Sequence, residues 1–301
     1  MNTYTETIKI SDYTKKHFKD HTLLKIETTG LSKFTDSVFM VATLEVNTGL
    51  LTIKYLSNLK DEFELISSLP TTNLITFNGD FDIAFLKEKF KFYKIDFSVE
   101  SFSLHKYLKN FNFILNLSSL KQKEIEKYLG LVRPKYISGF KIATSIKKYL
   151  ISKEEDNICE VLTHAKDSLT YLDKSLKIIE EIEAHINFKI NEYNFRIEKF
   201  NFKNNFLTIQ GQTELESELE INSFYHSLKV SEKTFKLQLE IKEGKYSDDE
   251  LVFYVLNKNG ELTNHSNIAS PHQIHLLYYK NPIWENILEL TKNHLSKLLV
   301  I

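Results

Sequence analysis

The stretch LKIETTGL, residues 24–31, carries the end of a β-strand into a loop. Residues 21–27 are β-prone and largely apolar, which predicts a strand from His21 to Glu27. Because side chains alternate across a strand, Lys25 and Glu27 are expected on one face and Ile26 on the other. A carboxylate at the end of an apolar strand, where a loop begins, is a candidate for chemistry.

The segments that follow alternate between strand-like and helix-like periods, which predicts an α/β fold. Two β-rich runs joined by a short turn come first, and a helix, a strand and a second helix come next. Helical patterning dominates the region after that. The predicted strands are 38–46, 50–56 and 73–77, the predicted helices are 61–69 and 82–92, and the helical region is 101–184 with breaks at 130–135 and 151–155.

The chain after about residue 185 consists of short alternating segments, which are typical of antiparallel strands with one buried face. We place a domain boundary between residues 180 and 195, which predicts one domain over 1–185 and a smaller, β-rich domain over 186–301. The predicted strands of the second domain are 196–202, 206–212, 216–221, 235–241 and 251–256, and an amphipathic helix is predicted over 282–299.

Composition excludes several classes of protein. With 301 residues, 42% of them hydrophobic and 26% charged, the chain has enough apolar material for a folded core, which excludes disorder and collagen-like structure. The one cysteine, Cys159, cannot form an internal disulfide, and its apolar helical surroundings predict a buried thiol. No apolar run approaches the ~20 residues of a membrane-spanning helix, and residues 1–10 lack a signal-peptide pattern. We therefore expect a cytoplasmic protein that does not associate with a membrane.

Charge is balanced over the whole chain but not locally. The 39 Lys and Arg nearly match the 40 Asp and Glu. Residues 87–148, however, contain 14 Lys and Arg against 5 Asp and Glu, with Phe and Tyr interleaved. One interpretation is a set of solvated helix faces, and the other is a patch that faces phosphates and stacks bases.

Two further acidic positions join Glu27 as candidates for chemistry. Asp82 stands at the entrance of a predicted helix in ITFNGDFDI, residues 75–83, where it could also be a plain N-terminal cap. Asp167 follows His164 by three residues in a helical segment, so both side chains are expected on the same helix face.

Three motifs in this order resemble a known family. They are LKIETTGL (24–31), FNGDFDIAFL (77–86) and LSSLKQKEIEKYLGLVR (117–133), followed by Ile137, Ser138 and Gly139. Together they are similar to the YprB-type ribonuclease H-like domain of the DEDD superfamily of 3′-5′ exonucleases, over roughly residues 20–180. The resemblance implies a mixed sheet flanked by helices. Nothing comparable covers residues 186–301.

The resemblance also implies four carboxylates that hold two Mg²⁺ or Mn²⁺ ions for phosphodiester hydrolysis. Glu27, Asp82 and Asp167 match three of these ligands. Lys25 stands where the family's first Asp is expected, and Thr163 stands where a tyrosine is expected four residues before the last Asp. We therefore predict a degenerate metal centre with zero or one ion.

Further site residues are assigned by the same resemblance. His164 is predicted to orient the attacking water in place of the missing tyrosine. Asn78 is interpreted as a turn residue. Together with Thr28 and Thr29 it is also a predicted contact to nucleic acid.

Lys25 allows two arrangements of the centre. In one, its ammonium bridges Glu27 and Asp167 at the position of the metal, which leaves a metal-free site. In the other, its flexible stem swings outward and leaves Glu27, Asp82 and Asp167 to hold one ion.

Three functions follow from these alternatives. The one that we favour is a nucleic-acid-binding ribonuclease H-like protein in which hydrolysis is doubtful. The second is an active Mg²⁺- or Mn²⁺-dependent 3′-5′ exonuclease on single-stranded DNA or RNA ends. The third is a scaffold that works through its C-terminal domain and an unknown protein partner. His272 and His275 lack the accompanying pattern of a zinc site, so we predict a structural role for both.

Overall fold

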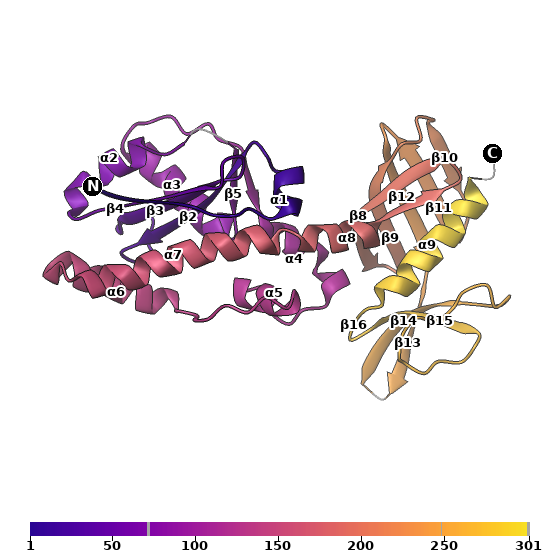
Figure 1. The fold of residues 1–301 in the computed structure, drawn as a ribbon. Coiled ribbons are helices and arrows are strands. Elements are labelled where there is room, and N and C mark those ends of the chain that lie inside the picture. The colour runs from indigo at the N-terminus through magenta and orange to yellow at the C-terminus, as the bar shows by residue number, and fades with distance from the viewer. Residues whose placement is uncertain (71–72, 248, 300–301) are drawn as a thin grey trace. The chain divides into compact units, whose positions relative to one another are not determined.

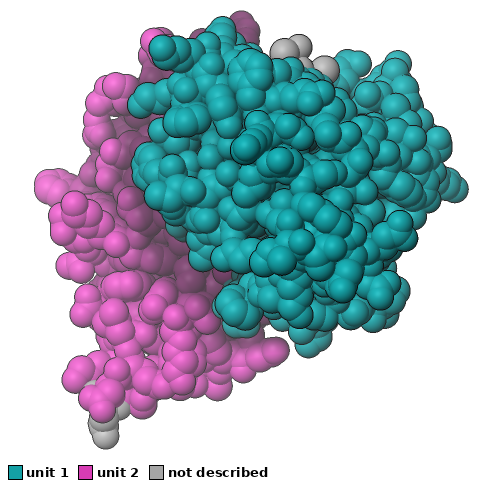
Figure 2. Space-filling view, turned by 90° about the vertical axis from the view of Figure 1, so that its left-hand side faces the viewer, with its two compact units in different colours: residues 1–109, 117–179 teal, residues 110–116, 180–301 magenta. Residues whose placement is uncertain are grey.

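The computed structural model describes residues 1–70, 73–247 and 249–299, and the chain forms two compact units. The first unit comprises residues 1–109 and 117–179, and the second comprises 110–116 and 180–301 (Figure 2). The sequence placed the boundary after residue 185 and did not assign 110–116 to the second unit. Residues 300–301 of the predicted second domain lie outside the described residues.

A six-stranded mixed sheet forms the centre of the first unit, with strand order β1-β4-β3-β2-β5-β6 (Figure 1). The strands β1 to β4 pair antiparallel, whereas β5 is parallel to both β2 and β6. This confirms the predicted mixed sheet, although β1 and β6 were not predicted as strands. The bounds are β1 Asn2–Thr7, β2 His21–Thr28, β3 Val38–Glu45, β4 Leu50–Tyr55, β5 Asn73–Thr76 and β6 Ser101–Ser103.

Helices flank this sheet, as predicted (Figure 1). The helix α7 (Glu155–Ser175) packs on β2 and β3 through a buried stripe that includes Val161, Ala165 and Leu169, which recur at helical spacing. The other helices of the first unit are α1 Asp12–His17, α2 Glu62–Ser67 preceded by a short 3-10 turn at Leu59–Asp61, α3 Gly79–Phe92, α4 Leu104–Leu115, α5 Gln122–Tyr128 and α6 Gly139–Ser152. The end of α4 and nearly all of α8 (Ile178–Ile186) belong to the second unit.

The prediction for Cys159 was wrong, because its side chain is exposed. It follows Ile158, which is buried on the stripe of α7 that faces the sheet. One residue along a helix turns the side chain by about 100°, so Cys159 leaves that stripe. Apolar neighbours in the sequence therefore did not predict on which face of α7 the side chain of Cys159 lies.

The second unit contains two antiparallel sheets and a C-terminal helix, α9 (Trp284–Leu298). Five of its described strands, β7, β11, β13, β15 and β16, were not predicted. The first sheet has the order β10-β11-β12-β9-β8-β7 and the second β13-β14-β15-β16. Their bounds are β7 Asn187–Ile190, β8 Tyr193–Lys203, β9 Phe206–Thr213, β10 Leu219–Asn222, β11 His226–Ser231, β12 Thr234–Glu240, β13 Lys242–Ser247, β14 Glu250–Leu256, β15 Ile274–Tyr279 and β16 Asn281–Pro282.

Aromatic packing explains why residues 110–116 belong to the second unit. The ring of Phe113 lies 4.8 Å from that of Phe200 and 4.7 Å from that of Trp284, between ring centroids. Phe200 and Trp284 also stack on each other at 5.8 Å. Helical periodicity continues through this segment, so the sequence pattern did not indicate that the segment changes unit.

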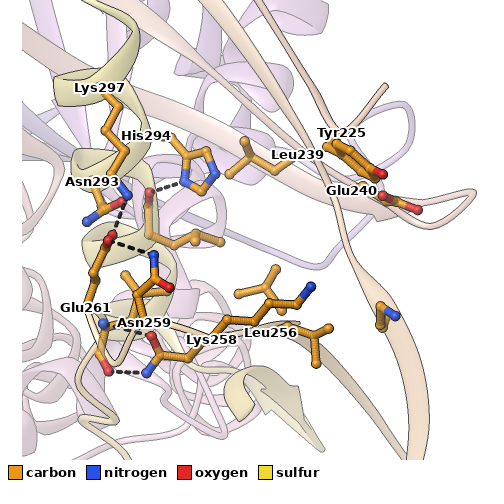
Figure 3. A pocket seen from close by; sticks show the side chains of 15 residues that line it. Tyr225, Leu239, Glu240, Leu256, Lys258, Asn259, Glu261, Asn293, His294 and Lys297 are labelled. Carbon is orange, nitrogen blue, oxygen red and sulfur yellow. Dashed lines mark hydrogen bonds and ion pairs between the residues drawn. The ribbon is translucent and has the colours of Figure 1, made fainter. Parts of the chain in front are cut away.

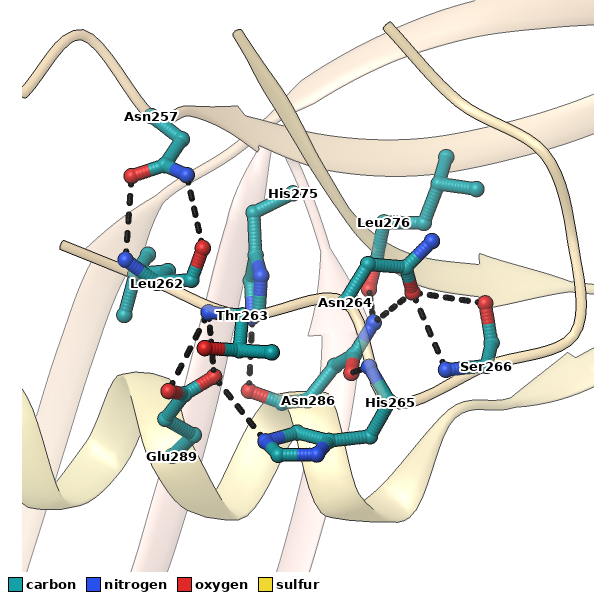
Figure 4. Close-up of polar contacts among 10 residues, drawn as sticks. All are labelled: Asn257, Leu262, Thr263, Asn264, His265, Ser266, His275, Leu276, Asn286 and Glu289. Carbon is teal, nitrogen blue, oxygen red and sulfur yellow. Dashed lines mark hydrogen bonds and ion pairs between the residues drawn. The ribbon is translucent and has the colours of Figure 1, made fainter. Parts of the chain in front are cut away.

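The segment between β14 and β15 is held by side-chain amides (Figure 4). The side-chain amide of Asn257 donates a hydrogen bond to the carbonyl oxygen of Leu262 and accepts one from its N–H. Asn286 of α9 accepts a hydrogen bond from the His265 N–H at 2.8 Å. His275 is buried, and its Nε2 lies 3.0 Å from the carbonyl oxygen of Asn286. This contact fits the predicted structural role of His275, which lies in β15.

Candidate nucleic-acid site around Lys25

The topology of the first unit brings β2, α3 and α7 together. Residues 21–23 of β2 pair with β5, and the strand then continues without a β5 partner. The helix α3 follows β5 and contacts β2, and α7 packs across β2. The end of β2 is therefore approached by side chains from both helices, which is where Glu27 lies.

Lys25 lies between two carboxylates. Its Nζ is 3.4 Å from Oδ1 of Asp82 and 3.9 Å from Oε1 of Glu27. The side chains of Lys25, Glu27 and Asp82 are 25%, 10% and 3% exposed. One of the two arrangements expected from the sequence was a bridge from Lys25 to Glu27 and Asp167, but the second partner in the structure is Asp82.

Asp82 faces Lys25 because α3 begins earlier than the sequence predicted. The helix starts at Gly79 with Asn78 as its N-cap, so Asp82 lies one turn inside it and is not the cap. Its Oδ1 also accepts a hydrogen bond from the backbone N–H of Ile26 at 3.5 Å. Asp82 thus connects the first turn of α3 to β2.

The charges of this cluster oppose the effect of burial. Burial would lower the pKa of Lys25, but the nearby charges of Asp82 and Glu27 raise it to about 12. Burial raises the pKa of both Glu27 and Asp82, and the ammonium of Lys25 opposes that rise. Lys25 is therefore a cation throughout the physiological pH range.

His164 completes the cluster from α7. Its Nε2 lies 3.5 Å from Oε1 of Glu27. Burial, together with the charges of Lys25 and Arg133, lowers the pKa of His164 to about 4, so the imidazole is neutral at pH 7. Oε1 of Glu27 is buried and accepts no hydrogen bond from the described residues. The Lys25 ammonium at 3.9 Å and the Nε2 of His164 at 3.5 Å are the polar groups that approach this oxygen.

Asp167 lies on α7 but outside the cluster around Lys25. It is half-buried, and within the described residues no hydrogen bond or ion pair engages its carboxylate. Burial raises the pKa of Asp167, while the charges of Arg133 and Lys166 lower it. Thr163 is exposed, and its hydroxyl donates to the carbonyl oxygen of Cys159 at 2.9 Å. Thr163 therefore does not occupy the place of a water-orienting tyrosine.

The predicted nucleic-acid contacts differ in accessibility. Thr28 and Thr29 are nearly buried. The hydroxyl of Thr28 donates to the Gly30 carbonyl at 2.5 Å, and that of Thr29 accepts from the Ser37 N–H at 3.0 Å. Both hydroxyls shape the loop after β2. Asn78 is exposed, and its side chain makes no capping hydrogen bond, so its amide is available to a ligand.

A buried ion pair beside the site was missed by the sequence reasoning. Arg133 makes two hydrogen bonds to the fully buried Glu126, with Nε 3.1 Å from Oε2, and Tyr136 bonds the same carboxylate. The guanidinium lies 4.9 Å from the ring centroid of Tyr171 on α7. Little in the sequence indicated this ion pair, because Arg133 lies in a segment rich in lysines that are mostly exposed.

Two loops beside these elements expose apolar side chains. Leu31 and Phe34 follow β2, Val132 lies between α5 and α6, and Phe140 lies in the first turn of α6. The carbonyl of Val132 accepts a hydrogen bond from the Tyr171 hydroxyl at 2.6 Å, which ties the second loop to α7. Exposed apolar groups beside a polar cluster are suited to contacts with unstacked bases.

The site does not fit a two-metal centre. A dication needs carboxylate oxygens that converge on it, but the space between Glu27 and Asp82 holds the ammonium of Lys25. Nowhere in residues 1–70, 73–247 and 249–299 do three or more His, Cys, Asp or Glu side chains form a group that could hold a metal ion. The three carboxylates predicted as ligands are therefore not arranged as a metal site.

A separate cavity of about 560 Å³ lies entirely within the second unit (Figure 3). Its walls come from β12, the end of β14 and α9. Glu261 is paired with Lys297 and accepts a hydrogen bond from Asn259 at 3.2 Å, and His294 bonds the Leu290 carbonyl at 3.1 Å. None of the predicted site residues lines this cavity.

Within the described part of the chain, no helix combines the length and apolarity that a membrane span requires.

Comparison with known families matches residues 23–182 to the model described as the RNase_H superfamily, more than half of the 301 residues. A comparison with curated proteins gives no match. A solved structure described as the apo form of the nuclease is 18% identical, covering 58% of this chain and 82% of its own, with a TM-score of 0.37. NrnC of Brucella melitensis is 14% identical, covering 57% of this chain and 77% of its own, with a TM-score of 0.38. The same protein with bound Mg²⁺ is 13% identical, covering 55% and 89%, with a TM-score of 0.28.

Proposed function

Because the chain belongs to the RNase H superfamily, we propose that its first unit binds single-stranded DNA or RNA ends at the Lys25 site without efficient hydrolysis. Membership confirms the predicted ribonuclease H-like fold. The narrower assignment, to the YprB-type domains of the DEDD exonucleases, remains a proposal that rests on the three sequence motifs.

The observation that carries this proposal is the position of the Lys25 ammonium between Asp82 and Glu27. A dication ~4 Å from an ammonium is repelled by about 2 to 8 kcal/mol at effective dielectric constants of ~80 to ~20. That repulsion is enough to prevent weak Mg²⁺ or Mn²⁺ binding. The ion pairs of Lys25 with the two carboxylates replace the metal as the charge that neutralises them.

A role in binding nucleic acid is supported by the basic segment 87–148. Of its lysines, Lys135 and Lys141 are paired with Glu160, and Lys89 is paired with Glu62. The remaining lysines form no ion pair within the described residues. These lysines and the exposed side chains of the two loops provide cations for phosphates and apolar surface for bases.

One observation favours the exonuclease as a second candidate. Oε1 of Glu27 accepts no hydrogen bond from the described residues, although it is ion-paired with Lys25, and the carboxylate of Asp167 forms neither a hydrogen bond nor an ion pair with them. If Lys25 swings outward, these groups and Asp82 are the carboxylates that would hold one Mg²⁺ or Mn²⁺. One bound ion supplies Lewis-acid activation of water, which allows slow hydrolysis.

The test is titration of the purified full chain with Mg²⁺ and Mn²⁺ by calorimetry, with parallel binding and digestion of a fluorescent single-stranded oligonucleotide. We expect oligonucleotide binding, no ion binding and no shortening of the oligonucleotide. Glu27→Ala, Asp82→Ala and Asp167→Ala should then change stability or binding without removing a nuclease activity. Mg²⁺-dependent shortening from the 3′ end that disappears in Asp167→Ala would establish the exonuclease instead.

A further inference from the structure

The six-stranded sheet of the second unit has one apolar and one polar face. Along β9 and β12 the side chains alternate, so that Leu207, Ile209 and Leu237 are buried on the inner face. The residues between them point to the other side. Lysines and side-chain amides are the commonest side chains of this outer face. They include Lys199, Asn201, Lys203 and Gln210 and, on β12, Lys236 and Gln238, with Thr208 between them; Glu240 of β12 also alternates to this side, opposite Phe206.

Strand pairing arranges these side chains in rows. Gln210 is opposite Lys199 of β8 on one side and Lys236 of β12 on the other. Neighbouring strands are ~4.8 Å apart, so the two lysine backbones stand about 10 Å apart with an amide between them. In the next row, Thr208 is flanked in the same way by Asn201 and Gln238.

The outer face is hollowed by a cavity of about 300 Å³ over β8, β9 and β12. Lys203, Lys236, Phe206 and several amide side chains line it, and no Asp or Glu is among its described lining residues. The amide of Gln238 donates a long hydrogen bond, of 3.3 Å, to the hydroxyl of Thr208. These polar groups are therefore loosely engaged and can exchange their partners for those of a ligand.

Positive charge on this face is not neutralised by the chain itself. Lys199, Lys203 and Lys236 are exposed and form no ion pair within the described residues. The nearest acidic neighbour in the β8 register, Glu198, is already engaged by Gln212 at 2.8 Å and by Arg196 at 3.6 Å. A polyanion is the ligand whose charge complements three unpaired lysines.

We propose that the outer face of this sheet is a second binding surface for single-stranded nucleic acid. Lys199, Lys203 and Lys236 contact phosphates, the amides of Gln210 and Gln238 bond base edges or sugars, and a base stacks on Phe206. A flat polar sheet with an aromatic ring suits an unpaired strand, whose base faces are exposed. The inference rests on the proposed function and extends it to the C-terminal unit.

The experiment measures anisotropy of a fluorescein-labelled 20-nucleotide single strand, as DNA and as RNA, with the full chain at several salt concentrations. The variant is Lys199→Gln/Lys203→Gln/Lys236→Gln. The matched control is Lys242→Gln/Lys245→Gln/Lys258→Gln, which removes the same charge from exposed lysines elsewhere in the second unit. Phe206→Ala tests stacking without changing charge, and circular dichroism checks that every variant is folded.

We expect the variant, but not the control, to bind at least about tenfold more weakly and to lose about 2 from the slope of log K against log salt concentration. If variant and control lose the same affinity for the strand, or if neither loses any, the proposed binding surface is wrong, whereas the proposed function of the first unit is unaffected. Wild-type protein that binds no strand overturns both proposals. If the variant loses affinity for poly-glutamate but keeps it for nucleic acid, the surface recognises an acidic protein and the inference fails.

Discussion

A single side chain, Lys25, decides how the acidic site of the first unit behaves. Its ammonium lies 3.4 Å from Asp82 and 3.9 Å from Glu27, and its pKa is raised to about 12. The folded state therefore binds this proton more tightly than the unfolded chain does. The stabilisation is complete below the ordinary pKa of 10.5 and is lost as the pH rises through about 12.

Replacing Lys25 by an acid should convert the cluster into a metal site. Lys25→Asp removes the repelling charge and returns the ligand that the family resemblance implies. We expect Mn²⁺ binding by calorimetry in Lys25→Asp and none in the wild type. Lys25→Met is the control, because it removes the charge without adding a ligand, and it should bind Mn²⁺ more weakly than Lys25→Asp. No Mn²⁺ uptake by either variant would show that the remaining carboxylates cannot converge on an ion.

His164 should make the first unit sensitive to acid. Its pKa is about 4 in the folded state, against 6.5 ordinarily, so it contributes stability that is present above pH 6.5 and is lost as the pH falls through about 4. The shift corresponds to about 3 kcal/mol. Lys25, Arg133, Glu160 and Glu27 are the charged groups that face it.

The measurement compares wild type with His164→Gln by urea unfolding at pH 7 and pH 4, followed by circular dichroism. Glu27 and Asp82 act in the opposite direction, because their raised pKa values favour the folded state as the pH falls. They are present in both proteins and cancel in the difference. A wild type that loses no more stability than His164→Gln on acidification would contradict the assigned pKa shift.

At the scale of elements, the loop between α5 and α6 is held by the buried pair of Arg133 and Glu126. The pair orders the loop that carries Val132 and Tyr136. The positive charge of its guanidinium helps to lower the pKa of His164 and opposes the rise that burial causes in the pKa of Asp167. A structural ion pair thereby contributes to the electrostatics of the site on α7.

Replacing one partner of this pair should lower the free energy of unfolding far more than replacing both partners. Arg133→Met leaves the carboxylate of Glu126 buried without its cation, and we expect a loss of about 3 to 5 kcal/mol in the free energy of unfolding. The double variant Arg133→Met/Glu126→Leu removes the buried charge as well and should recover most of that loss. Chemical denaturation of the three proteins gives the comparison, and equal stability of single and double variants would contradict it.

At the scale of the whole molecule, the two units can be followed separately. The chain has one tryptophan, Trp284, which is buried in the second unit. Its fluorescence therefore reports on the packing of that unit. Residues 110–116 contribute Phe113 to the cluster around Trp284, so a segment inside the family match also stabilises the second unit.

Phe113→Ala should therefore destabilise the unit that contains Trp284. It removes two aromatic pairs worth ~0.5 to 1.5 kcal/mol each, so we expect a loss of about 1 to 3 kcal/mol in the transition followed by tryptophan fluorescence. Phe92→Ala is the control, since that ring belongs to the first unit and is 71% exposed. An unchanged tryptophan transition in Phe113→Ala would remove segment 110–116 from the second unit.

The sequence by itself determined the elements whose pattern is local. The strand at residues 21–27, the hairpin at 38–56, the strand after residue 73 and the long helices were all predictable, because apolar periodicity is set within about ten residues. The strands β1, β6, β7 and β13 carry weak or polar patterns and exist because they pair with neighbours that the local sequence does not specify.

The candidate site divides in the same way. Sequence motifs identified Glu27, Asp82, Asp167 and the substituted Lys25, because residue type and order are visible without coordinates. Only the tertiary structure decided that Lys25 pairs with Asp82, that His164 joins Glu27, and that Arg133 sits buried beside them. The physical reason is that an ion pair depends on where a helix begins and which of its faces meets the strand, and a shift of three residues in the start of α3 places Asp82 one turn inside the helix.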